Sequence, residues 1–116
     1  MRILDDPRNP KAIKPEILEA LRRYTKDGLP PGSFLEAVLS NDLMEAVQRA
    51  DEENLRSIVA IATHVHNQVP WNIFGTKKLV KLWIELGAAI RLNAGHVEIN
   101  RITEGLLEAL KEKHEG

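Results

Sequence analysis

Residues 29–50 read LPPGSFLEAVLSNDLMEAVQRA and carry the strongest helix signal in the chain. Ser33 and Glu36 fit a capping box, in which the hydroxyl and the carboxylate satisfy each other's exposed backbone donors. Apolar residues occur nearly all round the helix that follows, which is typical of a central, buried helix. We therefore predict one continuous helix through this segment, with Leu39 and Leu43 in the core.

A polar pair, Asn41 and Asp42, lies in the middle of this apolar segment. Polar groups inside a buried helix cost stability unless they are hydrogen-bonded. Two interpretations stay open. The pair makes a buried contact that holds the loop at residues 30–32 or a neighbouring helix, or it contacts a ligand or a second subunit.

Helical patterns continue on both sides of this segment. Pro15 opens a helix that Asp27 and Gly28 stop, since proline suits a first helical turn and glycine suits a C-terminal cap. Asp51 is placed to cap a helix that Pro70 ends. The residues expected on the buried face of that helix are Leu55, Ile58, Val59, Ala62, Val65 and Val69.

The C-terminal third contains two more helical segments. The first begins at a Thr76 cap, and its aligned apolar residues are Leu79, Leu82, Trp83, Leu86 and Ile90. Residues 88–100 fit either a helix that continues to Asn93 or a short hairpin around Ala94-Gly95, and the helix is favoured. A last helix at residues 96–116, strongest from Ile99 to Lys113, has an inner face of Ile99, Ile102, Leu106, Ala109 and Leu110.

This last helix must bury its apolar stripe against its own chain or a second copy, and we predict a subunit contact. The composition supports a single all-α domain over residues 1–116, because aromatic residues make up only 4% and the core must be built from aliphatic side chains. We predict a bundle of four or five helices. Residues 1–13, with two prolines, are expected to form an irregular arm.

Charge and cysteine content exclude several classes of protein. The 16 basic and 17 acidic residues give a formal net charge of -1, which argues against a general nucleic-acid binder. The chain has no cysteine, so disulfide scaffolds, thiolate zinc sites and cysteine nucleophiles are excluded. No apolar run is long enough for a membrane span or typical of a signal peptide. We expect a cytoplasmic protein with no membrane partner.

No motif for catalysis is present. Walker and dinucleotide glycine patterns are absent, and so is the Gly-x-Ser-x-Gly motif of serine hydrolases. His64 and His66 are two residues apart, which places them on divergent faces of a helix, where they cannot share a metal ion. We therefore expect a non-enzymatic protein with no metal and no cofactor.

Two helix starts are suited to binding anions. At Gly32-Ser33, the glycine lets a ligand approach the backbone N–H groups of the helix. At Thr76-Lys77-Lys78, an anion would relieve the unfavourable placement of lysines beside the positive end of the helix dipole. Trp71 precedes the second start and offers a surface for stacking a base. The alternatives are an ordinary capped turn and a solvated basic face. The candidate ligand-binding residues are Gly32, Ser33, Asn41, Asp42, Trp71, Thr76, Lys77 and Lys78.

Residues 29–54 resemble a family of small proteins encoded by bacteriophages and prophages. The shared pattern is Pro-Pro-Gly-(Gly/Ser)-Phe-Leu-x-Ala-Val-Leu-x-Asn-Asp-Leu, which falls here at residues 30–43. The resemblance implies a phage accessory protein that acts in the infected host cell, and such proteins often counter host defence. We therefore predict a homo-oligomeric protein that sequesters a small anionic ligand, with a cyclic nucleotide signal as the favoured ligand. The alternative is a protein–protein inhibitor of a host defence protein, or a structural accessory protein, with no small ligand.

Overall fold

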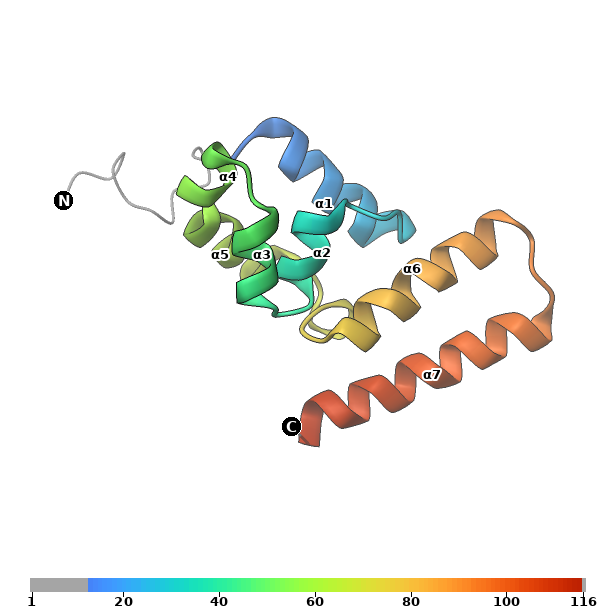
Figure 1. Ribbon diagram of the computed structural model, residues 1–116. Helices are drawn as coiled ribbons and strands as arrows, with labels where there is room; N and C mark the ends of the chain where they lie inside the picture. The colour runs from blue at the N-terminus through green and yellow to red at the C-terminus, as the bar shows by residue number, and fades with distance from the viewer. Residues whose placement is uncertain (1–12, 116) are drawn as a thin grey trace.

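The computed structural model describes residues 13–115, and within this range the chain is all-α, without a strand (Figure 1). The helices are α1 (Pro15–Asp27), α2 (Ser33–Leu39), α3 (Leu43–Arg49), α4 (Glu52–Arg56), α5 (Ile58–Gln68), the 3₁₀ turn η3 (Trp71–Ile73), α6 (Lys77–Arg91) and α7 (His96–Glu115). The predicted all-α class is confirmed. The predicted number of helices is too low, because two of the expected helices are each broken in two. Of the predicted N-terminal arm, only Ile13 lies among the described residues, and it is buried.

The first break separates α2 from α3 at the polar pair. Asn41 adopts a left-handed backbone conformation with φ 62°, which asparagine tolerates better than most residues. The Asp42 carboxylate then accepts a hydrogen bond from the Glu45 N–H at 3.1 Å and caps α3. The prediction of one continuous helix is therefore wrong. The polar pair serves as a helix stop followed by a helix start.

This break changes which side chains are buried. Leu39 is 0% exposed, as predicted, but Leu43 is 66% exposed, so its predicted burial is wrong. The predicted capping box is also wrong, because Gly32 occupies the N-cap position of α2 and no side chain caps the helix. Ser33 is instead the first helical residue.

The second break lies at Ser57, between α4 and α5. Asp51 caps α4 through the Asn54 N–H at 2.7 Å, as predicted, and α5 ends just before Pro70. Because the chain changes course at Ser57, the buried face differs from the predicted one. The exposed residues among those predicted to be buried are Leu55, Val59 and Ala62, whereas Val65 and Val69 are buried as predicted and Ala60 and Ile61 join them.

The main core gathers around Tyr24 of α1, which is fully buried. Its hydroxyl donates to the carbonyl oxygen of Ile73 at 2.5 Å, and burial raises the pKa of this phenol well above its usual value. Its own carbonyl oxygen accepts from the indole N–H of Trp83 at 2.6 Å. One residue of α1 therefore positions both η3 and α6.

The end of α1 crosses α6 at two glycines. A Cβ atom on Gly87 would lie 2.3 Å from the carbonyl oxygen of Asp27, and one on Gly28 would lie 2.7 Å from that of Trp83. Arg91 adds a hydrogen bond to the Asp27 carbonyl oxygen at 2.7 Å. Helix α6 continues through Gly87 to Arg91, and this glycine allows the two backbones to touch.

Helices α6 and α7 form an antiparallel hairpin that projects beside the other helices (Figure 1). The helical reading of residues 88–100 is confirmed, since α6 ends at Arg91 and α7 begins at His96. Ile102 and Ala109 of α7 are each 1% exposed, as the predicted inner face requires. The stripe is thus covered by α6 of the same chain, so the reason given for a subunit contact no longer applies. Large apolar residues of the hairpin that stay exposed are Ile90, Leu92, Val97 and Leu107.

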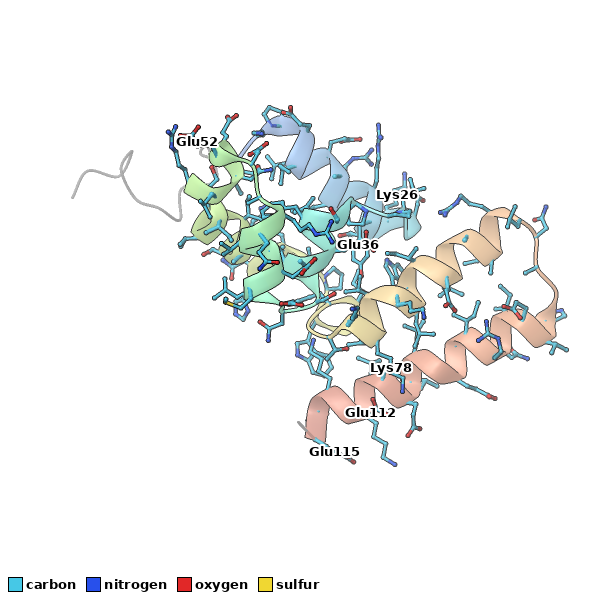
Figure 2. All side chains as sticks on the ribbon, in the orientation of Figure 1. Lys26, Glu36, Glu52, Lys78, Glu112 and Glu115 are labelled. Atoms are coloured by element: carbon cyan, nitrogen blue, oxygen red, sulfur yellow. The ribbon has the colours of Figure 1, made fainter. Side chains whose placement is uncertain are left out.

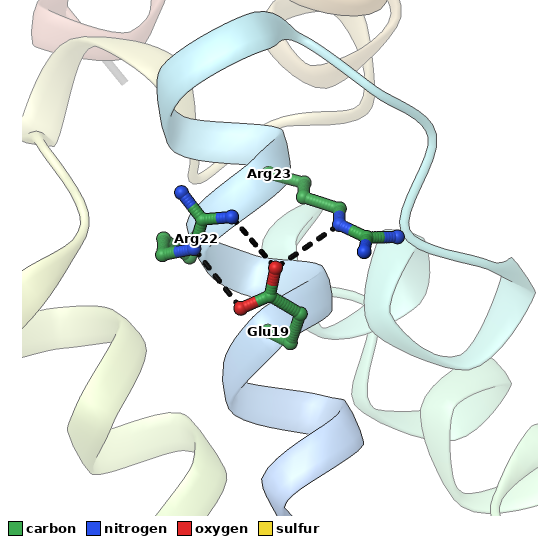
Figure 3. Close-up of polar contacts among 3 residues, drawn as sticks. All are labelled: Glu19, Arg22 and Arg23. Atoms are coloured by element: carbon green, nitrogen blue, oxygen red, sulfur yellow. Dashed lines mark hydrogen bonds and ion pairs between the residues drawn. The ribbon is translucent and has the colours of Figure 1, made fainter.

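Three surface charges on α1 are paired within the helix (Figure 3). The Glu19 carboxylate accepts from Arg22 at 2.6 and 3.0 Å and from Arg23 at 3.1 Å. The hydrogen bonds from Arg22, more than any other cause, lower the pKa of Glu19 to about 2. These arginines therefore already have an anionic partner.

The break at Asn41 gives a testable contrast between two leucines of neighbouring helices. Leu39→Ala should cost roughly 2–5 kcal/mol of unfolding free energy, because it empties a fully buried site. Leu43→Ala should cost less than about 0.5 kcal/mol, because the side chain faces solvent. Urea unfolding followed by circular dichroism measures both. Equal costs would show that α2 and α3 are one buried helix.

The α1–α6 crossing predicts opposite outcomes for two helical glycines. Gly87→Ala should destabilise by roughly 1–3 kcal/mol, because its methyl group meets backbone atoms that cannot move aside. Gly105→Ala in α7 is the matched control. Its methyl group would meet only the flexible Leu82 side chain, at 3.3 Å, so the better helix propensity of alanine should offset the cost to within about 1 kcal/mol. A stabilising Gly87→Ala would contradict the crossing.

Candidate ligand-binding cavity

A cavity of about 680 Å³ lies where the C-terminal ends of α2 and α7 meet α5, the η3 loop and the first turn of α6. It brings together four of the predicted site residues, which come from three segments of the chain: Asn41, Trp71, Thr76 and Lys78. The other lining residues are Val38, Ala62, Val65, His66, Phe74, Gly75, Ala109, Glu112 and Lys113. The cavity therefore combines an aliphatic wall with a rim of polar and aromatic groups.

The rim of the cavity is anchored to the main core. Thr76 caps α6 by accepting the Leu79 N–H at 3.1 Å, as predicted. One residue earlier, the Gly75 N–H donates to the Leu39 carbonyl oxygen at 2.6 Å, which ties the loop to α2. Trp71 is 53% exposed, so part of its ring is open to a ligand.

Lys78 is paired across the hairpin. Its ammonium group lies 3.1 Å from the Glu112 carboxylate of α7, and Figure 2 shows the two residues on facing helices. Both side chains are about half exposed, so solvent screens the pair and it contributes little stability. An anionic ligand can therefore compete with Glu112 for Lys78.

Lys113 occupies a cage formed by the η3 loop. Its ammonium group donates to the carbonyl oxygens of Trp71, at 2.5 Å, and Phe74, at 2.6 Å. The same atom lies 4.3 Å from the centre of the Trp71 ring and 4.6 Å from that of Phe74. Desolvation lowers the pKa of Lys113 from its usual value, whereas the carbonyl dipoles and ring faces stabilise the charged form.

The other predicted site residues lie elsewhere. Ser33, Asp42 and Lys77 line a second cavity of about 530 Å³, whose further charged residues are Glu36, Glu45, Lys81 and Glu85. Gly32 lines neither cavity. The two lysines that follow Thr76 therefore face different cavities, and the eight predicted residues do not form one site.

The two neighbouring histidines lie in different places, since His66 lines the first cavity and His64 lines a separate groove beside α1. Among residues 13–115, no cluster of three or more His, Asp or Glu side chains could hold a metal ion. None of the helices described for this range is both long and apolar enough to cross a membrane.

Sequence reasoning missed Glu112 and Lys113 as cavity residues. The aromatic residues before Thr76, Trp71 and Phe74, could be recognised from the sequence, and both line the cavity. No local pattern could identify Lys113, because its partners lie 39 and 42 positions earlier in the chain. Their meeting depends on how α7 folds back on α6.

Comparisons with known proteins add no assignment. No family model, curated protein or solved structure matches the chain.

Proposed function

We propose that this protein is a non-enzymatic binding protein whose 680 Å³ cavity takes a small anionic ligand with a flat ring, a cyclic nucleotide being the class that fits best. The observation that carries the proposal is the convergence of Asn41, Trp71, Thr76 and Lys78 on one cavity. The phage resemblance of residues 29–54 suggests the biological setting, in which binding removes a signal of host defence.

The size and chemistry of the cavity support this proposal. Pockets for small ligands measure about 300–1,000 Å³ and combine apolar walls with a few polar groups. The half-exposed Trp71 ring offers a surface for base stacking. Lys78 supplies positive charge, and the start of α6 supplies backbone donors. These groups suit a ligand that combines a phosphate with a flat base better than they suit inorganic phosphate alone.

Calorimetry and thermal shift with a panel of cyclic di- and trinucleotides test the proposal. A ligand that binds only the folded state raises the melting temperature in proportion to the logarithm of its concentration. We expect at least one member of the panel to give saturable heat and stabilisation. If no nucleotide of the panel gives heat or stabilisation at millimolar concentration, the proposal that the cavity binds a cyclic nucleotide is wrong.

The placement of the lysines supplies matched variants. Lys78→Ala should weaken binding by roughly tenfold to a hundredfold, because a charged hydrogen bond to the ligand is lost. Lys77→Ala should leave the affinity unchanged, because Lys77 lines the second cavity. Trp71→Ala should cost about 1–3 kcal/mol of binding. Glu112→Gln should strengthen binding, because it releases Lys78. Equal losses from the two lysine variants would place the ligand elsewhere.

A second candidate function, protein–protein binding, is favoured by the surface of α3. Leu43 and Met44 are 66% and 73% exposed, and Val47 lies on the same side one turn later. Leu55 and Val59 are exposed on α4 and α5. Exposed apolar residues that gather on one surface are characteristic of sites where another protein docks.

The double variant Leu43→Asp/Met44→Asp separates the two functions. It should abolish association with any host protein that copurifies with the unaltered chain, and it should leave calorimetric ligand binding intact. Light scattering on both forms reports whether the same surface mediates self-association. An unchanged set of bound proteins and an unchanged mass would dismiss this surface as a binding site.

A further inference from the structure

Among the residues that the structure describes, 13–115, no carboxylate pairs with the Lys113 ammonium group. A buried or half-buried charge costs free energy unless it is compensated. Of its three N–H donors, two are directed to the carbonyl oxygens of Trp71 and Phe74, and the two ring faces supply further negative potential. Dipoles and ring faces of this kind are the usual elements of a site that recognises an ammonium group.

The space for this group depends on Gly75. A Cβ atom at this position would lie 2.8 Å from Cε and 2.9 Å from Nζ of Lys113. A side chain at this position would therefore displace the flexible end of Lys113. Gly75 also has φ 110°, a conformation that side chains other than glycine rarely adopt. Glycine at this position thus leaves room for the end of Lys113, and the backbone conformation favours glycine independently.

The cage is built by the body of the protein, whereas the lysine comes from α7. The Tyr24 hydroxyl holds the Ile73 carbonyl, and the Gly75 N–H is bound to the Leu39 carbonyl. Neither of these contacts involves α7, so both can form without Lys113. The backbone of the cage is therefore held in place by residues outside α7.

Apart from Lys113, helix α7 makes few contacts with helices α1 to α5. Its buried residues Ile102 and Ala109 pack outside the main core cluster, in a layer shared with α6. Besides the packing of Ala109, the C-terminal turns make the solvent-screened Lys78–Glu112 ion pair and an edge-on contact of His114 with the Trp71 ring. The same turns contribute Ala109, Glu112 and Lys113 to the cavity wall.

We propose that residues 71–75 form a binding site for a primary alkylammonium group, and that Lys113 is its resident ligand, latching the C-terminal turns of α7 over the cavity as a releasable lid. The ammonium site stands on its own geometry. The role of the lid in controlling ligand entry to the cavity rests on the proposed function.

Nuclear magnetic resonance on the full chain tests the ammonium site directly, with n-butylammonium as the probe and n-butanol as its neutral control. In Lys113→Ala the site is empty, so n-butylammonium should shift the Trp71 indole signal and the Gly75 amide signal in a saturable way, while n-butanol should not. In the unaltered chain the tethered lysine competes at high effective concentration, so apparent binding should be about tenfold weaker or more. Equal responses of the two proteins, or no saturable response of the variant, would overturn the proposal.

Hydrogen exchange tests the latch. Lys113→Ala should accelerate exchange of the amides in residues 106–113 by roughly tenfold or more, because two charged hydrogen bonds and two ring contacts are lost. Lys111→Ala is the matched control, since Lys111 is an exposed residue two positions earlier on the same helix. Identical exchange in the two variants would refute a latch. Far-UV circular dichroism confirms that both variants keep their helices.

These experiments use no nucleotide, so their outcome is independent of the ligand panel. If Lys113→Ala releases α7 and a nucleotide binds, its association rate should rise several-fold, because the lid no longer limits entry. If the release is observed and no nucleotide binds, the latch stands and the proposed ligand class fails.

Discussion

The contact between the end of α1 and the C-terminal half of α6 is the constraint on which the arrangement depends. Two glycines let the backbones meet, and Tyr24 links the crossing to the η3 loop through its hydroxyl and to Trp83 through its carbonyl oxygen. Because α6 is fixed at this point, its first turn is held beside the ends of α2 and α5, where the cavity forms. Among residues 13–115, α7 packs mainly against α6.

Features of the fold that depend on neighbouring residues could be predicted from the sequence. The caps at Asp51 and Thr76, the stop before Pro70 and the helical class of residues 88–100 each have a local cause and are found as expected. The breaks at Asn41 and Ser57 were missed, because apolar periodicity continues across both positions. A helix that ends and restarts after a short turn keeps nearly the same spacing of apolar residues, and only the tertiary packing shows which of them face outward.

The candidate site shows the same division. The sequence identified Trp71, Thr76 and Lys78 as neighbours along the chain, and they do line one cavity. The sequence could not show that Lys78 and Lys77 line different cavities. Adjacent helical residues point about 100° apart, but the sequence does not reveal which other helices each of them faces. It could not find Lys113, because a contact between residues so distant in the chain is set by the position of a whole helix.

The separate apolar layer between α6 and α7 has a consequence for cooperativity. A protein whose buried residues form one cluster unfolds as a unit, whereas a helix that packs mainly on one neighbour can open as a smaller unit of lower stability. The cavity wall is divided between these two units, since α5 and the loop belong to the first and the end of α7 to the second. Anything that fills the cavity therefore bridges them. Occupancy would therefore couple the opening of α7 to the unfolding of the remaining helices.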